Sequence, residues 1–328
     1  MILVAPMMDL TDRHCRYFLR QVCSRARLYT EMITCGALLH GDVEQHLAFD
    51  RAEHPVGLQL GGSDPEDLAR CAKLGADYGY DEINLNIGCP SERVQKGAFG
   101  ACLMAEPALV GEGVAAMKAA VGIPVTVKCR IGIDAQDPEA SLDEFTRVVA
   151  AAGADAVVVH ARKAWLDGLS PKQNRHIPPL DYDRVYRLKH ANPGREIVIN
   201  GGIASLDEAV SHLRHVDGVM MGRAAYQEPW RLLAVDAELF GLPATFRSPK
   251  EAALALVPYI EREIARGTRL HAVARHVLGL FHGVPGARAF RRHLATEGVK
   301  PGAAARTFLD ALALVRDADA EAPRTAAA

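Results

Sequence analysis

The sequence lacks the features that mark membrane and secreted proteins. No apolar run approaches the length of a membrane span. The chain starts with Met1 and an apolar stretch, without a basic segment or a cleavage signal. The formal net charge is only −2 and 49% of the 328 residues are hydrophobic, so bulk charge does not predict a polyanion-binding protein. We expect a globular, cytoplasmic protein without a membrane partner.

The seven cysteines lack the spacing of a zinc cluster or a disulfide framework. Their number is odd and no Cys-x-x-Cys pair occurs. We therefore expect reduced thiols and no metal. Two of the cysteines lie in residues 86–104, NIGCPSERVQKGAFGACLM. This stretch favours a loop that moves about Gly97 and Gly100 and carries the thiol of Cys89 at its root. It gives no role to Cys102 beyond that of a structural thiol.

Positive charge is concentrated in one part of the chain. Residues 241–300 contain ten Lys or Arg and four Asp or Glu, a local charge of +6, which leaves −8 for the rest. Such an asymmetry suggests an anionic partner. The alternative is a basic helix face that is simply solvated, and charge alone does not decide between the two.

Eight short apolar runs recur between residues 2 and 226, mostly separated by amphipathic stretches. They are residues 2–6, 27–32, 55–62, 82–90, 124–132, 156–163, 196–203 and 218–226. Near-continuous apolar runs are typical of parallel strands that are covered on both faces. Ser141 and Ser205, each followed three residues later by an acid, are predicted helix N-caps.

This alternation predicts an α/β protein with a (β/α)₈ TIM barrel over residues 1–240. A doubly wound open sheet is less favoured because no Gly-x-Gly-x-x-Gly follows the first run. Helical periodicity continues at 248–267, 270–281, 287–298 and 301–318. It predicts a small C-terminal helical bundle at 241–318, and residues 319–328 are predicted to be a disordered tail.

Polar residues stand where the predicted strands end, and barrel enzymes carry their chemistry at those ends. They are Pro6, Met7 and Met8; Gln59; Asn86 and Cys89; Lys128 and Arg130; His160, Arg162 and Lys163; Asn200, Gly201 and Gly202; Gly222 and Arg223. The Asn-Gly-Gly and Gly-Arg segments follow strands 7 and 8, where barrels commonly bind phosphate through backbone N–H groups. The set suits a flat polar heterocycle that carries a phosphate.

Each of these residues also has a structural interpretation. Lys128 can belong to a buried ion pair, and His160 can be a core histidine with satisfied hydrogen bonds. A Schiff-base aldolase centred on Lys128 is a further possibility, but it leaves Gln59 and the Pro-Met-Met turn without a role.

Six segments resemble those of the tRNA-dihydrouridine synthases, and most closely those of the bacterial DusA branch. These segments are residues 5–20, 86–104, 160–182, 200–203, 222–230 and 279–294. The resemblance covers nearly the whole chain. It implies an FMN-containing barrel with a C-terminal helical domain that binds tRNA. Such an enzyme reduces the C5=C6 bond of D-loop uridines with NADPH, and the branch implies positions 20 and 20a.

The resemblance also implies roles for individual residues. The flavin-binding positions fall on Pro6, Met7, Met8, Gln59, Lys128, His160, Asn200, Gly201, Gly202, Gly222 and Arg223. The catalytic cysteine falls on Cys89, and the asparagine that holds the uracil edge falls on Asn86. The tRNA contacts fall on Lys172, Arg175, Arg288 and Arg291. A free thiol is mostly protonated at neutral pH, so Cys89 can donate the proton that C5 requires.

Two other functional classes remain open at this point. One is a small-molecule FMN-dependent oxidoreductase of the dihydropyrimidine or dihydroorotate type, and the other is an RNA-binding module without enzymatic activity. No sequence fingerprint separates NADPH from NADH. We expect a monomer because no additional apolar helix face is evident.

Overall fold

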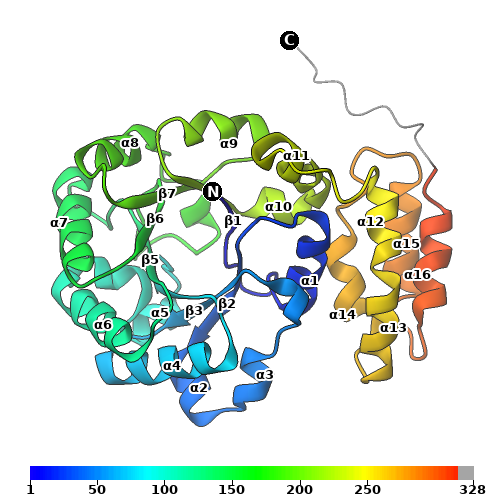
Figure 1. Ribbon diagram of the computed structural model, residues 1–328, viewed down its shortest axis with the longest axis horizontal. Helices are drawn as coiled ribbons and strands as arrows, with labels where there is room; N and C mark the ends of the chain where they lie inside the picture. Colours follow the sequence, from blue (N-terminus) through cyan, green and yellow to red (C-terminus); the bar gives the residue numbers. More distant parts are fainter. Residues whose placement is uncertain (317–328) are drawn as a thin grey trace. The chain divides into compact units, whose positions relative to one another are not determined.

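The computed structural model describes residues 1–316, and it contains eight strands in a ring (Figure 1). The strands are β1 (Ile2–Val4), β2 (Leu28–Thr34), β3 (Val56–Gly61), β4 (Glu82–Ile87), β5 (Val125–Arg130), β6 (Ala156–His160), β7 (Glu196–Asn200) and β8 (Gly218–Met221). Each lies within or beside one of the eight apolar runs. The predicted tail, 319–328, lies outside the described residues.

The strands form one parallel sheet in the order β1-β8-β7-β6-β5-β4-β3-β2. The ring closes between β1 and the residue before β2, through a parallel bridge between Leu3 and Arg27. Two backbone hydrogen bonds form it, from Val4 N to Arg27 O at 2.9 Å and from Arg27 N to Ile2 O at 2.9 Å. This closure confirms the predicted TIM barrel and excludes an open, doubly wound sheet.

One part of the barrel interior is apolar. Residues from β1, β2, β6, β7 and β8 form a buried cluster, against which Met7 packs. Its members are Leu3, Ala5, Tyr29, Val158, Val198 and Met220. Branched and apolar side chains of this kind normally fill the whole interior of such barrels.

The part formed by β3, β4 and β5 is different, because polar and apolar residues alternate along these strands. Gln59 is 1% exposed and lies between Leu58 and Leu60, and Asn84 lies between Ile83 and Leu85. Successive side chains of a strand point to opposite faces. The near-continuous apolar pattern that we predicted therefore holds only in part: in β3–β5 the polar side chains bond to one another across the strands.

Helices follow the strands around the barrel, with these bounds: α2 (Cys35–His40), α3 (Val43–Leu47), α4 (Pro65–Tyr78), α5 (Glu92–Lys96), α6 (Pro107–Ala120), α7 (Pro138–Ala151), α8 (Tyr182–Ala191) and α9 (Leu206–Leu213). Ser205 caps α9 as predicted, accepting from Glu208 N at 3.1 Å. The prediction for Ser141 is wrong. Asp137 caps α7 instead, and the helix begins at Pro138. Ser141 therefore lies within its first turn.

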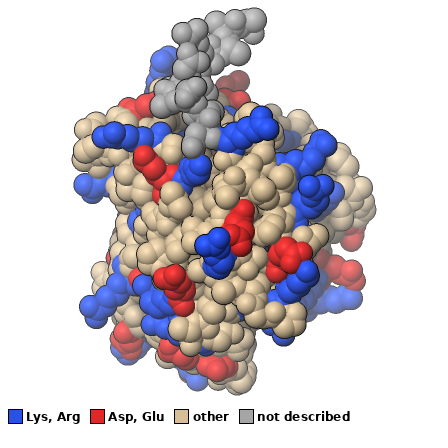
Figure 2. Space-filling view, turned by 90° about the vertical axis from the view of Figure 1, so that its right-hand side faces the viewer, with Lys and Arg blue, Asp and Glu red and all other residues tan. Residues whose placement is uncertain are grey.

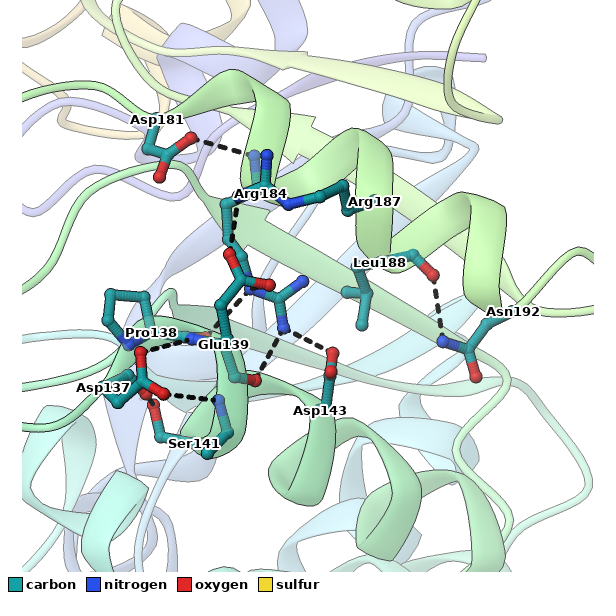
Figure 3. Close-up of polar contacts among 11 residues, drawn as sticks. Asp137, Pro138, Glu139, Ser141, Asp143, Asp181, Arg184, Arg187, Leu188 and Asn192 are labelled. Atoms are coloured by element: carbon teal, nitrogen blue, oxygen red, sulfur yellow. Dashed lines mark hydrogen bonds and ion pairs between the residues drawn. The ribbon is translucent and has the colours of Figure 1, made fainter.

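A buried arginine joins α7 to α8 (Figure 3). The Arg184 side chain donates from Nε to Pro138 O at 2.9 Å and from Nη2 to Glu139 O at 3.0 Å. It also forms ion pairs with Asp143 and, at 3.4 Å, with the Glu139 carboxylate. On the same helix, Arg187 is about half exposed and pairs only with the Glu139 carboxylate.

By internal contacts the chain divides into two compact units, Met1–Arg13 with Ala26–Gly222, and His14–Arg25 with residues 223–316. The second unit contains most of α1 (Arg13–Val22), with α10 (Arg223–Gln227), α11 (Val235–Phe240), α12 (Pro249–Ala255), α13 (Val257–Ala265), α14 (Leu270–Ala274), α15 (Ala287–Thr296) and α16 (Ala305–Ala313). Our domain boundary at residue 240 stays a prediction.

Two of the predicted C-terminal helices are shorter than expected. The segment 248–267 is broken at Leu256, because Pro258 has no N–H to continue the hydrogen bonds of α12 into α13. The segment 270–281 is helical only to Ala274, followed by a 3₁₀ turn at Arg275–Val277. Within this unit α1 packs on α13, since Tyr17 stacks on Tyr259 with ring centroids 3.8 Å apart.

Residues 1–316 contain neither a membrane-spanning helix nor a cluster of metal ligands. In this part of the chain no helix is both long and apolar enough to cross a bilayer. No group of three His, Cys, Asp or Glu side chains is placed there to hold a metal ion.

We expect Arg184→Met to lower the free energy of unfolding by about 2–4 kcal/mol, because two carbonyls lose their donor and an ion pair is broken. Urea denaturation followed by circular dichroism measures this. The matched control is Arg187→Met on the same helix, whose ion pair is exposed to solvent and is expected to contribute little to stability. Equal shifts of the two midpoints would contradict the assignment.

Candidate active site

The parallel register brings the predicted site residues of β4–β7 to one rim of the barrel. Asn86 is opposite Lys128, and His160 is opposite both Arg130 and Asn200. All of these residues are at or near the carboxyl ends of their strands. Gln59 lies on β3 and is opposite Asn84 on β4.

The amides of Gln59 and Asn86 bond directly to each other. Asn86 Nδ2 donates to Gln59 Oε1 at 2.8 Å, and Gln59 Nε2 donates to Asn84 Oδ1 at 2.7 Å. Asn86 Oδ1 in turn accepts from the backbone N–H groups of Gly88 and Cys89, at 3.1 and 3.0 Å. An amide has two N–H donors and two acceptor lone pairs. Each of the two side chains therefore keeps one N–H for a ligand.

The backbone groups of Cys89 and of its two neighbours are hydrogen-bonded. Cys89 O accepts from Ala101 N at 2.9 Å. The carbonyl before it, Gly88 O, accepts from Arg130 Nε at 3.1 Å, and Pro90 O accepts from Gln95 Nε2 at 3.0 Å. The Cys89 thiol itself is partly exposed and donates to Ser91 Oγ at 3.6 Å.

The stretch 86–104 is more ordered than the predicted loop, because it contains α5 and a 3₁₀ turn at Gly100–Ala105. Gly100 has a φ of +76°, and a Cβ there would lie 2.7 Å from Cys89 O. A glycine is therefore required for close packing at this position. Gly97 caps α5, and movement of the segment stays a prediction. Cys102 donates to Phe99 O at 3.1 Å, and burial raises the pKa of its thiol.

Lys128 is mostly buried at the rim, and no side chain or carbonyl of residues 1–316 is recorded as a partner of its amine. Burial, and then the charge of Arg130, lower the pKa of Lys128 to about 8. Burial also lowers the pKa of Arg130 to about 10, against the opposing effect of the Cys89 thiol. Arg175 and Arg162 lower it further. Cations gathered in this way around a buried lysine and a buried arginine are expected to bind an anionic ligand.

The two glycines that follow β7 in the sequence pack closely against their surroundings, Gly201 against His160. Gly201 and Gly202 have φ angles of +120° and +73°, and a Cβ on Gly201 would lie 2.7 Å from His160 Cδ2. Asn200 uses its Nδ2 to bond Met220 O on β8 at 2.7 Å. Larger residues would be strained here and would displace the histidine. Gly202 is exposed, whereas Gly201 is buried and its carbonyl accepts from the Tyr182 hydroxyl at 2.7 Å. Phosphate binding by this segment stays a prediction.

The remaining predicted cofactor residues follow β1 and β8. Ala5 N bonds Met221 O at 2.8 Å, which keeps the turn of Pro6, Met7 and Met8 next to the end of β8. Met8 is 57% exposed, whereas Met7 packs on the barrel core. Arg223 follows Gly222 directly and is the first residue of α10, in the second unit.

The predicted tRNA-binding residues are exposed cations in both units. Lys172 and Arg175 lie at the 3₁₀ turn Gln173–Arg175 of the first unit. Arg288 and Arg291 lie on the exposed side of α15, whose other side buries Phe290 and Leu294. No partner for these two arginines is recorded within the described chain. Figure 2 shows basic side chains scattered among acidic ones on the face it draws, rather than in one continuous patch.

The chain is similar to proteins of a known family. The family described as Dihydrouridine synthase (Dus) matches residues 3–315. A tRNA-dihydrouridine(20/20a) synthase from Vibrio parahaemolyticus is 56% identical over 313 residues, 95% of this chain and 96% of its own length. The proteins of the same name from Salmonella typhi and Escherichia coli K12 are each 57% identical over 315 residues, 96% of this chain, and 95% and 91% of their own lengths. The chain belongs to the dihydrouridine synthase family.

The structure of this dihydrouridine synthase family member identifies two residues that sequence reasoning missed. Gln95 donates to Leu166 O at 2.9 Å as well as to Pro90 O, so it joins the Cys89 segment to the loop after β6. Asn174 is fully buried and bonds both the N–H and the carbonyl of Trp165, each at 2.8 Å. Both lie inside the segments that carry the family resemblance, but their partners are backbone groups, which leave no signature in a sequence.

We expect Lys128→Met to stabilise the ligand-free protein at pH 7 by up to about 3 kcal/mol, since the charged amine is buried without a recorded partner. Below the folded-state pKa of about 8, Lys128 is protonated in both states and the penalty is complete. As pH rises from there toward the ordinary 10.5, the folded state loses its proton and the penalty is relieved.

The advantage of Lys128→Met should therefore shrink steadily over that pH window, as measured by denaturation midpoints. Lys73→Met replaces an exposed lysine on α4 and should show no such trend. A Lys128→Met variant that is less stable than the wild type at every pH would refute the assignment.

Proposed function

We propose that this chain is an NADPH-dependent, FMN-containing tRNA-dihydrouridine synthase that reduces uridines 20 and 20a of tRNA. The observation that carries the proposal is the rim itself: a partly exposed thiol, Cys89, held beside Asn86 and Gln59 in a barrel whose relatives are named for this reaction. The seven free cysteines fit a reducing compartment, so we place the enzyme in the cytoplasm. We propose that it acts as a monomer.

The residues at the rim fit FMN. Lys128 offers an unpaired cation, Gln59 keeps one N–H and one lone pair, and Gly201 with Gly202 presents backbone. The proposed FMN-binding set is Pro6, Met7, Met8, Gln59, Lys128, His160, Asn200, Gly201, Gly202, Gly222 and Arg223. When bound, FMN supplies the hydride chemistry, with NADPH as the source of electrons.

Cys89 is proposed to donate the proton. Addition of hydride to C6 of the uracil leaves negative charge on C5 and on the C4 carbonyl, and a proton must reach C5 from the other face. The exposure of the thiols supports this role, because Cys89 and Cys102 are partly exposed whereas the other five cysteines are buried. The free N–H of Asn86 is available to donate to a uracil carbonyl.

The substrate must bring its base to this rim. A uridine in a folded tRNA exposes its ring faces only after unstacking, which takes a few kcal/mol in a duplex and less in a loop. Phosphate contacts position the RNA and supply most of its affinity. We assign these contacts to Lys172, Arg175, Arg288 and Arg291, all of which are exposed.

We expect Cys89→Ala to oxidise NADPH normally but to form dihydrouridine about 10²- to 10⁴-fold more slowly, because only the proton donor is lost. Dihydrouridine in purified tRNA is measured by mass spectrometry of nucleosides. Cys102→Ala removes the neighbouring thiol of the same segment and should keep wild-type rates. Wild-type yield from Cys89→Ala would refute the proton-donor role.

We expect the double variant Arg288→Glu, Arg291→Glu to bind tRNA at least about tenfold more weakly, and its log K to fall less steeply with log salt, because phosphate contacts are lost. NADPH oxidation without tRNA should not change. The control reverses two exposed cations of the barrel helices, Lys73 and Arg147. Equal losses in both double variants would point to bulk charge rather than to α15.

A further inference from the structure

A chain of hydrogen-bonded, buried polar side chains runs along the neighbouring strands β3, β4 and β5 to the Cys89 segment. It starts at Glu82, which accepts a short hydrogen bond from Thr126. Asn84 Nδ2 then donates to Thr126 Oγ1 at 2.7 Å, and Gln59 donates to Asn84 as described above. Glu82 and Asn84 are fully buried and Thr126 is 4% exposed. The chain ends at Asn86 and the peptide of Cys89.

The direction of these bonds is fixed at the upper end. Backbone N–H groups can only donate, so the atom of Asn86 that faces Gly88 and Cys89 must be its oxygen. Its NH₂ group therefore faces Gln59, which must accept with its oxygen and donate onward with its nitrogen. The same reasoning orients Asn84 and leaves the Thr126 hydroxyl to donate downward to Glu82.

The lower end fixes the same direction independently. A carboxylate only accepts hydrogen bonds, and Glu82 is paired with Arg27 at 2.6 Å. Besides Thr126, the hydroxyl of Tyr29 donates to it at 2.8 Å. Every link thus runs from donor to acceptor toward Glu82, and none has two donors or two acceptors facing each other. Reversing one amide would break the bonds on both of its sides.

We propose that Glu82 is a positioning residue for the reaction at the rim. Through Thr126 and Asn84 it orients the amides of Gln59 and Asn86, and Asn86 in turn holds the peptide of Cys89. The catalytic importance of this placement rests on the proposed function, in which Cys89 is the proton donor. The placement itself rests on hydrogen bonds alone.

The test breaks the chain at its centre with Thr126→Val, which keeps the shape and removes the hydroxyl. Thr126→Ser restores the hydroxyl and serves as the rescue variant. The matched control is Thr146→Val on α7, another buried threonine (1% exposed), whose hydroxyl has no partner within residues 1–316. Glu82→Gln is the second variant, since its amide can donate as well as accept and no longer imposes one direction.

The first readout is the rate at which iodoacetamide alkylates Cys89, measured by peptide mass spectrometry relative to Cys102 in the same sample. Loss of one hydrogen bond corresponds to about a fivefold change in an equilibrium. We expect this ratio to rise about fivefold in Thr126→Val and in Glu82→Gln, and to stay at the wild-type value in Thr126→Ser and Thr146→Val. Dihydrouridine formation at saturating tRNA should fall in the first two variants, without a change in tRNA affinity.

A folded Thr126→Val protein with wild-type Cys89 alkylation and wild-type turnover would overturn the proposal. So would equal effects of Thr126→Val and Thr146→Val, because those would indicate general loosening. If the wild type forms no dihydrouridine but Thr126→Val still shifts Cys89 alkylation, the proposed function fails and the positioning role stands. If the wild type is active and both readouts are unchanged in Thr126→Val and Glu82→Gln, the positioning role alone fails.

Discussion

The rest of the barrel depends on the closure of the ring at Arg27. The backbone N–H and carbonyl of Arg27 bond β1 and close the ring, and its guanidinium pairs with Glu82 inside that ring. A polar side chain that is buried inside the closed ring is unfavourable for stability unless it is hydrogen-bonded there. The hydrogen-bonded chain from Glu82 to Asn86 meets that requirement for β3, β4 and β5.

On the side of β3–β5 the barrel interior contains hydrogen-bonded polar side chains instead of an apolar core. The apolar cluster around Val158 and Met220 supplies burial on the other side. Lys128 shows the cost most clearly, because burial lowers the pKa of its amine to about 8 and no acidic side chain of residues 1–316 pairs with it. An uncompensated buried charge is unfavourable for stability and typical of a binding site.

The sequence predicts the parts of this structure that follow from local pattern. The eight apolar runs give the eight strands, and Asn200-Gly201-Gly202 stands at the rim as its position after a strand predicts. Helix ends were less predictable: Ser141 offers a capping pattern, but Asp137 followed by Pro138 offers a better one four residues earlier. The alternation Leu58-Gln59-Leu60 was visible too, yet a sequence does not say that Gln59, Asn84 and Thr126 meet across three strands.

What a sequence cannot show is which hydrogen bonds hold the peptide of Cys89. Gly97 and Gly100 suggest a loop that moves. In the structure Gly100 packs against Cys89 O and leaves no room for a side chain. The N–H and carbonyl of Cys89 are bonded, as are the carbonyls of Gly88 and Pro90. A thiol on so constrained a peptide has little freedom to search for its target. In the proposed reaction the uracil would therefore have to reach the thiol, with phosphate contacts supplying the binding energy for that placement.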